Sequence, residues 1–262
     1  MPDSATPRAK ATTDIQAWRI GLAAAFCVIW ELVARNVTSL LLPSASATLV
    51  ALAELLATAD LWRALLTSHE ALLVGFVAAS LIGVPAGLVL GLWPRMARWF
   101  DPHLELLMVT PMSAIIPIII LAAGLSIWSR ALVVFAFALP IVIVSAETGM
   151  RDADQRLVDM ARTFGASRGQ VIGRVLIPAA LPAVFAGLRL GLGRAFSGMV
   201  VSELVLMAAG VGGLLLRFQA DFDAASVYAL VIVVVLEAVA LMTLGERLER
   251  RLLAWKRTDA TA

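Results

Sequence analysis

Long apolar segments separated by short polar ones make up most of the chain. A helix needs about 20 residues to cross the hydrocarbon core of a bilayer. Six segments are long and apolar enough, namely residues 17–35, 69–92, 104–124, 130–147, 178–206 and 225–245. Several contain prolines, which membrane helices tolerate where neighbouring helices or a water-lined cavity satisfy the freed carbonyls. The pattern therefore predicts an all-α, polytopic membrane protein with six transmembrane helices.

Small residues recur in the second predicted span. Gly75, Gly83, Gly87 and Gly91 are separated by multiples of four residues, so they share one face of a helix. Such a stripe allows two helix backbones to approach closely. We interpret it as a helix-packing face.

The composition agrees with a membrane protein. The chain is 61% hydrophobic and 15% charged, whereas soluble domains are nearer half apolar and a quarter charged. Its net charge is only +2 and its basic residues are scattered, so nothing indicates nucleic-acid binding. The single cysteine, Cys27, lies in the first apolar segment and excludes an intrachain disulfide or a cysteine-rich metal site.

Lysine and arginine in the connections predict the orientation, because cytoplasmic loops of membrane proteins are enriched in both. With a cytoplasmic N-terminus, the inner segments hold fifteen basic residues and the outer segments four. The inner ones are Arg8, Lys10, Arg19, Arg95, Arg98, Arg151, Arg156, Arg162, Arg168, Arg174, Arg247, Arg250, Arg251, Lys256 and Arg257. The outer ones are Arg35, Arg63, Arg130 and Arg217. Both termini are therefore predicted to be cytoplasmic.

The two longer outer connections have different patterns. Residues 41–62 contain Pro43 and then Ser44 or Ser46 as a candidate N-cap, which predicts a short helix at the outer surface. Residues 208–223 are rich in glycine and then amphipathic, and we interpret them as a bent outer loop.

A short polar stretch at residues 157–182 interrupts the apolar pattern on the cytoplasmic side. Leu157, Met160, Ala161 and Phe164 fall at i, i+3, i+4 and i+7, which places them on one face of a helix. Gly165 then permits the left-handed conformation that ends helices.

A second helix is predicted directly after this glycine. Ser167 and Gln170 form a Ser-x-x-Gln capping-box pattern, and Pro178 suits the first turn of the span that follows. The stretch is thus predicted to be a helix, a turn and a helix. Two interpretations remain open: a surface helix that rests in the lipid interface or on its own bundle, or an amphipathic helix that docks in a groove of a partner protein.

Two arginines lie within the fifth predicted span. Arg189 is near mid-depth and Arg194 is further out, and intramembrane charges indicate function by default. Both could line a pathway for an anion, with Glu203 as a further pathway-lining candidate. Alternatively, they pair with Glu203, Glu237 or backbone carbonyls and hold the bundle together. Glu203 and Glu147 lie at span ends, where they could instead face water.

Other function classes have weaker support. An ion-gradient-driven secondary transporter needs buried acidic residues near mid-depth, and only Glu237 qualifies. A membrane enzyme needs clustered nucleophiles and bases at the interface, whereas the chain has two histidines, His69 and His103, on opposite sides. No metal site is expected there.

The segment "VDMARTFGASRGQVIGRVLIPAALP" resembles the EAA loop of ABC-importer permeases of the binding-protein-dependent type. Asp159, Met160 and Ala161 match the opening acidic-small-small positions, and Gly165 matches the glycine. Val175 matches the branched residue, and Ile177 with Pro178 matches Leu-Pro. The departures are aspartate for glutamate, methionine for the first alanine and isoleucine for leucine.

Further blocks resemble the nitrate/sulfonate/taurine branch of these permeases. They are "LLPS", "GFVAASLIGVPAGLVLGLWPRMARWFDP", "TPMSAIIPIIILAAGL" and "GLRLGLGRAFSGMVVSEL". The resemblance covers residues 18 to 250 and implies the six-helix, MetI-like fold of type I importers. Where the branch commonly has an aromatic residue and then glycine, this chain has Ala122, Ala123 and Gly124.

The resemblance also implies function and partners. The chain would be the non-catalytic permease subunit of an importer in the bacterial inner membrane, for a small, anionic or heterocyclic solute such as a sulfonate, nitrate or taurine. It would form a homodimer that contacts a soluble binding protein outside and an ABC ATPase inside. ATP and Mg would be bound by that ATPase, since this sequence has no Gly-x-x-x-x-Gly-Lys-Ser/Thr stretch, and no cofactor is expected on this chain.

The expected organisation is a cytoplasmic N-terminal tail (1–16), a permease domain (17–247) and a cytoplasmic C-terminal tail (248–262). The ATPase-coupling EAA loop occupies about residues 148–177 of the permease domain.

Overall fold

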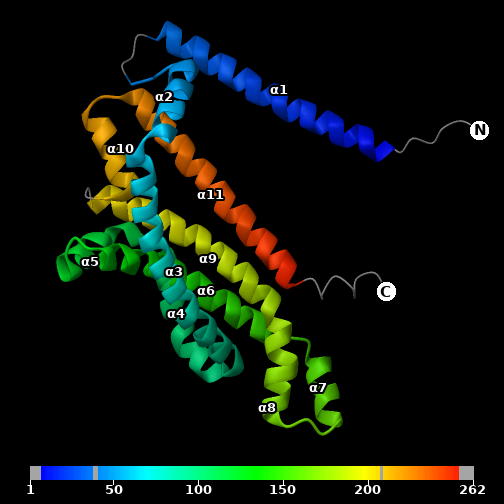
Figure 1. Ribbon diagram of the computed structural model, residues 1–262. Coiled ribbons are helices and arrows are strands. Elements are labelled where there is room, and N and C mark those ends of the chain that lie inside the picture. The colour runs from blue at the N-terminus through cyan, green and yellow to red at the C-terminus, as the bar shows by residue number, and fades with distance from the viewer. Residues whose placement is uncertain (1–6, 38–40, 207–208, 254–262) are drawn as a thin grey trace, which may run out of the picture. The chain divides into compact units, whose positions relative to one another are not determined.

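The computed structural model describes residues 7–37, 41–206 and 209–253, and every regular element in these ranges is a helix (Figure 1). The elements are α1 (Pro7–Asn36), α2 (Ala45–Ala57), α3 (Ala59–Leu92), α4 (Pro94–Val109), η1 (Met112–Ala114), α5 (Ile116–Ala123), α6 (Ile127–Arg151), α7 (Gln155–Thr163), α8 (Arg168–Val171), η2 (Ile172–Leu176), α9 (Ile177–Leu206), α10 (Gly210–Ala220) and α11 (Ala224–Leu252). The all-α prediction is confirmed.

Four of the six predicted apolar segments coincide with long apolar helices. Four stretches in the described ranges are long and apolar enough to span a membrane: Ala59–Leu92, Ile127–Arg151, Arg168–Val205 and Ala224–Leu252. The bent pair formed by α4 with η1 and α5 is a fifth if it counts as one span. The first predicted span, residues 17–35, lies within α1, which is not among these candidate spans.

The third predicted span, residues 104–124, is not a single helix. The region falls in two helical segments, Pro94–Val109 and Met112–Ala123, which meet at an angle of 82°. Thr110 has ψ 131° and Pro111 has ψ 94°, so both leave the helical conformation. The ring of a proline disfavours the helical region for the residue before it, which explains why the break falls at Thr110.

The described chain divides into two compact units, each with its own contacts. The first comprises parts of Met1–Thr58 with Arg217–Val233. In it, Ser44 caps α2 by accepting a hydrogen bond from the Ala47 N–H. Glu31 of α1 accepts hydrogen bonds from the Ser46 N–H at 3.0 Å and the Ser46 hydroxyl at 2.9 Å. The predicted short helix with a serine cap is confirmed.

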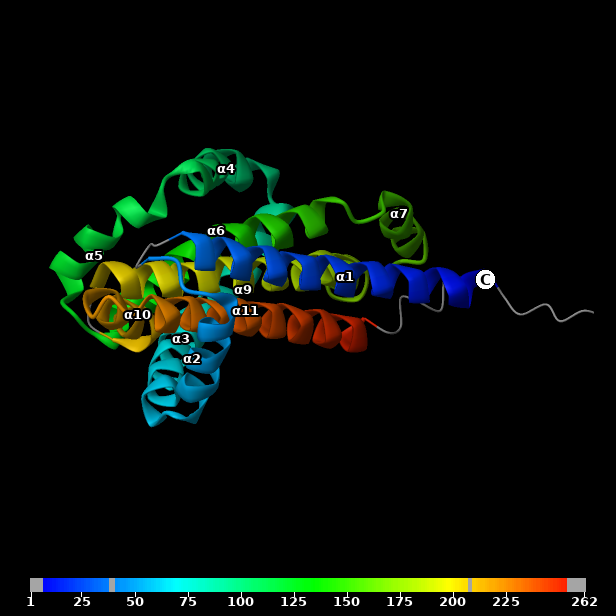
Figure 2. The ribbon, with the colours of Figure 1, turned by 90° about the horizontal axis from the view of Figure 1, so that it is seen from above.

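The second unit comprises Ala59–Leu216 and the described part of Val234–Ala262, and α6 is central to it. Helices α3 and α9 both pack on α6, while α4 and α5 run along its outside (Figure 2). A Cβ atom on Gly83 would lie 2.9 Å from Val142 Cγ1, and one on Gly91 would lie 2.5 Å from Met150 Cβ. The glycine stripe therefore packs α3 against α6, as predicted.

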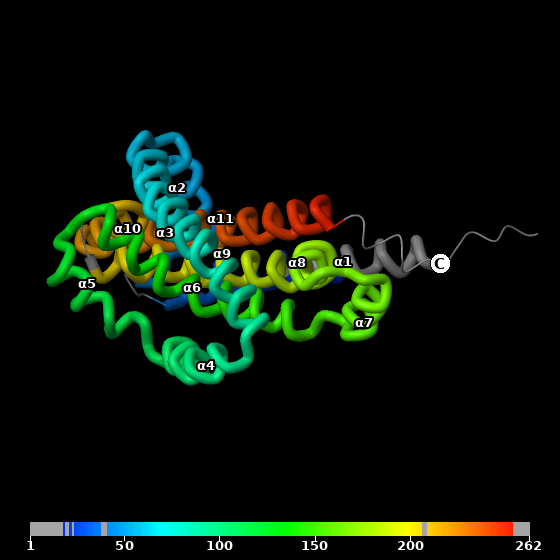
Figure 3. Tube along the Cα trace, turned by 90° about the horizontal axis from the view of Figure 1, so that it is seen from below, coloured from blue at the N-terminus to red at the C-terminus, as the bar shows by residue number. Residues whose placement is uncertain are grey.

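The polar stretch forms the predicted helix, turn and helix. Gly165 has φ +79°, the Gly165 N–H donates to Arg162 O, and the Ala166 N–H donates to Ala161 O. This is a Schellman ending, which glycine favours because it has no Cβ. Ser167 and Gln170 then form a capping box at the start of α8. The two short helices lie side by side (Figure 3).

Pro178 lies in the first turn of α9, as predicted, although the helix is continuous over Arg168–Val205 and the π-helical turn η2 ends at Leu176. A wider turn there is the kind of local adjustment that accommodates a proline lacking its N–H donor. Residues 210–220 form α10 rather than a bent loop, while Ala208 lies outside the described residues.

Candidate functional site

Helix α7 presents an apolar face that its own unit leaves uncovered. Leu157, Met160 and Phe164 are 44%, 54% and 84% exposed, respectively. Val158, on the opposite side of the same helix, is only 4% exposed. The helix is thus packed through one side, and three large apolar side chains remain available for another surface.

The residues of the EAA resemblance are distributed over this hairpin and the helix that follows it. Asp159 and Met160 are exposed on α7, and Ala161 is half-buried beside them. Gly165 forms the turn, and the remaining members, Val175, Ile177 and Pro178, lie half-buried in η2 and the start of α9. The motif therefore belongs to one helical hairpin joined rigidly to a long apolar helix.

Arg189 and Arg194 of α9 have different surroundings. The Arg189 Nη1 lies 3.2 Å from Glu246 Oε1, and its Nε lies 3.2 Å from Glu249 Oε2. Both carboxylates belong to α11, so Arg189 joins two helices. Arg189 therefore forms ion pairs, which is one of the two alternatives predicted for it. Its partners are Glu246 and Glu249 rather than the predicted Glu203 or Glu237.

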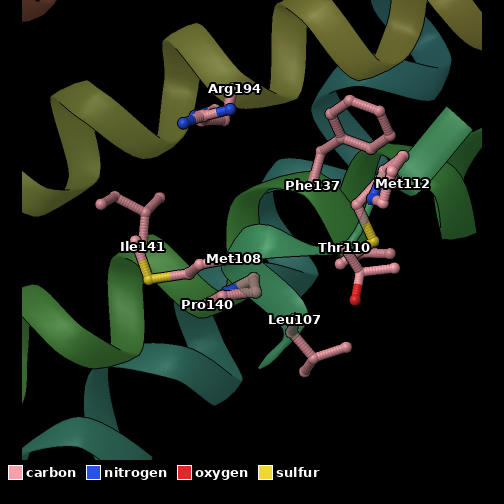
Figure 4. A pocket seen from close by; sticks show the side chains of 10 residues that line it. Leu107, Met108, Thr110, Met112, Phe137, Pro140, Ile141 and Arg194 are labelled. Atoms are coloured by element: carbon pink, nitrogen blue, oxygen red, sulfur yellow. The ribbon is translucent and has the colours of Figure 1, made fainter. Parts of the chain in front are cut away.

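Arg194 lines a cavity of about 190 Å³. The cavity lies where the break between α4 and α5 meets α6 and α9, and Figure 4 shows Arg194 across from Pro140 and Leu107. Its other lining residues are uncharged: Leu107, Met108, Thr110, Pro111, Met112, Ala136, Phe137, Pro140 and Ile141. Within the described ranges Arg194 has no carboxylate partner, so this guanidinium supplies the positive charge of the cavity.

Glu203 lies in a buried polar cluster near the opposite end of the second unit from α7. It is 0% exposed, so the interpretation in which it faces water is wrong. Its Oε2 accepts hydrogen bonds from the Ser68 hydroxyl at 2.8 Å and the Gly212 N–H at 3.1 Å. Its Oε1 lies 3.4 Å from Arg130 Nη1. The role of Glu203 in lining a pathway stays a prediction.

This cluster also contains residues that the sequence analysis did not identify as functional. In the sequence Arg130 indicates only an outer connection, yet it is 9% exposed and contacts both Glu203 and the Thr67 carbonyl. Ser68 is fully buried, and its Oγ accepts from the Val211 N–H. The position of Arg130 at a predicted span boundary could have indicated a buried charge. Its partner Glu203 lies 73 residues away, so the sequence does not reveal the pair.

Two further acidic side chains of the second unit lie next to basic side chains. Glu237 of α11 lies 3.0 Å from His69 Nε2 of α3. Glu147 is 4% exposed and pairs with Arg151 at 2.6 Å, so it does not face water either. Among the described residues, no three His, Cys, Asp or Glu side chains come together in a way that could hold a metal ion.

The sequence is similar to a family of transport proteins and to several of its members. The family described as "Binding-protein-dependent transport system inner membrane component" matches residues 79–254. The taurine transport system permease protein TauC of Escherichia coli is 34% identical over 198 residues, which cover 75% of this chain and 72% of TauC. The formylaminopyrimidine transport permease protein ThiX of Halalkalibacterium halodurans is 28% identical over 239 residues, which cover 88% of this chain and 92% of ThiX.

The fold is also similar to that of a solved transporter. A chain of the MetNI methionine ABC transporter, in an inward-facing conformation, matches with a TM-score of 0.60 at 18% identity. The match covers 73% of this chain and 94% of that one. The apolar helices, the EAA-type hairpin and these matches together show that the chain is a multi-pass ABC-importer permease of the binding-protein-dependent family, on the branch that includes the taurine permease.

Proposed function

We propose that this permease forms the membrane pathway for a small organic sulfonate and that α7 couples the pathway to a separate ABC ATPase. The observation that carries the substrate class is Arg194, whose guanidinium lines an otherwise uncharged cavity and has no carboxylate partner among the described residues. Guanidinium groups match the geometry of oxyanions and stay charged at any working pH. The similarity to a taurine permease supports the same class, since taurine carries a sulfonate.

Arg194 and Arg189 have separate roles in this proposal. The charge of Arg189 is balanced by Glu246 and Glu249, whereas Arg194 faces a cavity and has no acidic partner in the part of the chain that the structure describes. An anion that passes the cavity would gain attraction from Arg194 and little from Arg189. An arginine of this kind favours entry of an anionic group without binding it so tightly that it cannot leave.

The coupling step uses the exposed face of α7. Leu157, Met160 and Phe164 form an apolar surface of the kind that enters a groove on a partner protein. The hairpin continues without a break into Arg168–Val205, so a displacement of α7 is transmitted to α9 as a rigid body. Arg194 lies on α9, which links the coupling surface to the cavity.

The remaining assembly follows from the same proposal. Both termini would lie in the cytoplasm, with α7 beside the ATPase and α10 on the outer face near a solute-binding protein. Two copies of this chain would enclose the pathway, while ATP and Mg would be bound by the ATPase subunits. The excess of basic residues in the α7-side connections supports this orientation.

The substrate class is tested by uptake of radiolabelled taurine in cells that carry the complete importer. We expect Arg194→Gln to lower the initial rate by about tenfold, which corresponds to the loss of one charge-assisted contact. Arg189→Gln is the matched control, since it removes the same charge from the same helix outside the cavity. Co-purification of the ATPase with both variants verifies assembly.

Unchanged taurine uptake by Arg194→Gln, at wild-type expression, would refute the assignment of Arg194. A result in which only Arg189→Gln impairs uptake would move the anion pathway to the α9–α11 side of the second unit.

A further inference from the structure

A second and larger cavity lies between the α7–α8 hairpin and the helix ends next to it. Its volume is about 570 Å³, which falls in the range of about 300–1,000 Å³ typical of ligand pockets. The ends of α3 and α6 form one side, and α7, α8 and η2 form the other. Three of its lining residues are arginines, Arg151, Arg162 and Arg168, each from a different helix, and none of its lining residues is acidic.

The three arginines differ in how their charges are balanced. Arg151 pairs with Glu147 at 2.6 Å and with Asp101 at 3.2 Å, so its charge is compensated inside the protein. Arg162 and Arg168 have no carboxylate partner within the described ranges. Because guanidinium groups are not deprotonated in proteins, this cavity holds two unbalanced positive charges.

The other lining residues add apolar contacts to a cavity whose arginines remain accessible from solvent. Val158 and Val171 are both buried, and Trp93 is 54% exposed. The buried valines keep water from one side of the cavity, which reduces the screening of the arginine charges on that side. Gln155 adds an amide that can donate a further hydrogen bond.

The site is distinct from the surface assigned to the ATPase. Gln155, Val158 and Arg162 lie on the cavity side of α7, and Leu157, Met160 and Phe164 lie on its exposed apolar side. These two sets fall on opposite faces of a helix with 3.6 residues per turn. An anion in the cavity therefore does not compete with a protein bound to the apolar face.

We propose that this cavity binds a tetrahedral oxyanion between Arg162 and Arg168. Sulfate, phosphate and the phosphodiester of an anionic lipid share the required chemistry, since each offers several acceptor oxygens to two guanidinium groups. The bound anion would join α7 to α8 and hold the hairpin against the ends of α3 and α6. The cavity borders the π-helical turn through Ile172 and Leu176, and such turns are frequent at functional sites.

The binding is measured by equilibrium dialysis of the full chain, in detergent and free of added anions, against radiolabelled sulfate. We expect saturable binding of one sulfate per chain. The variant Arg162→Gln/Arg168→Gln should weaken this binding by about tenfold or more, because two charge-assisted contacts are lost. The matched control is Arg156→Gln/Arg174→Gln, which removes two exposed arginines from the same region outside the cavity and should bind as the wild type does.

The thermal unfolding temperature tells whether weaker sulfate binding reflects a folding defect. Sulfate should raise the thermal unfolding temperature of the wild type and of the control but not that of Arg162→Gln/Arg168→Gln. All three proteins should unfold at similar temperatures without sulfate, since neither pair of arginines has an acidic partner in the described structure. Equal sulfate binding by all three proteins, or no saturable binding by the wild type, would overturn the proposal.

Changing the lipid composition tells whether the bound anion is a lipid headgroup or a free anion. In nanodiscs of phosphatidylcholine, added phosphatidylglycerol should abolish sulfate binding if a lipid headgroup occupies the cavity. Sulfate binding that persists in phosphatidylglycerol identifies a free anion as the ligand. Neither result depends on the transported solute, so a failed taurine-uptake test leaves this test intact.

Discussion

Arg130 of α6 and Glu203 of α9 form an ion pair inside the second unit, with 3.4 Å between Arg130 Nη1 and Glu203 Oε1. The same carboxylate accepts the Gly212 N–H at the start of α10. A negative charge at the first turn of a helix is favourable, because the N–H groups there lack intrahelical partners. Glu203 thus fastens the start of α10 to α6 and α9.

Replacing Glu203 should destabilise the protein. Glu203→Ala leaves Arg130 buried without its charge partner, and breaking a buried pair in this way costs about 3–5 kcal/mol. We expect a clear fall in the thermal unfolding temperature of the purified chain in detergent. Glu70→Gln, an exposed acid on α3, is the control and should unfold as the wild type does. Equal unfolding temperatures for both variants would contradict the anchoring role of Glu203.

The glycine stripe of α3 should not accept even one methyl group at its closest contacts. A Cβ on Gly87 would lie 2.7 Å from Ala146 Cβ and would also meet the Ile143 carbonyl. Overpacking of this kind costs about 1–3 kcal/mol, so Gly87→Ala should lower the unfolding temperature. Gly21→Ala places the same group where nothing lies within 4 Å and should have no such effect. A Gly87→Ala protein as stable as Gly21→Ala would show that α3 and α6 can separate easily.

A charge on the exposed face of α7 should uncouple the permease from its ATPase. Met160→Glu places a carboxylate in the proposed apolar interface, where an unpaired charge is costly to bury. We expect association with the ATPase to weaken by about tenfold or more, equivalent to about 1.4 kcal/mol per factor of ten. Co-purification and uptake measure the effect.

Arg156→Gln changes a charge on the same helix and should leave both of these properties intact. Full uptake and normal co-purification of Met160→Glu would instead show that α7 rests on lipid or on its own bundle.

The environment of Glu237 bears on how transport is powered. A proton- or sodium-driven carrier would need a titrating carboxylate at this position, whereas an ATP-driven importer does not. We expect Glu237→Gln to import solute at close to the wild-type rate, since glutamine keeps the volume and an acceptor for His69. Loss of uptake without loss of the folded chain would favour the ion-gradient alternative. The measurement is initial uptake in cells with and without a protonophore, at matched ATP levels.

Local chemistry determined the parts of the fold that the sequence predicts well. The serine cap of α2, the glycine ending of α7 and the Ser167–Gln170 capping box depend on residues a few positions apart, so a single sequence contains them. Apolar length in the same way marked the four long helices that could span a membrane in the described ranges, and the bent pair that could be a fifth. The break at Thr110 could also have been found, because Pro111 disfavours a helical conformation for its predecessor.

The tertiary structure alone decided which charges meet. Arg189 and Arg194 are five residues apart and look equivalent in the sequence, yet one is neutralised by α11 and the other faces a cavity. The sequence likewise did not distinguish a water-facing Glu203 from one paired with Arg130, 73 residues away. Ion pairs and cavities depend on which helix faces pack together, and that packing is set by shape and burial over the whole unit rather than by neighbours along the chain.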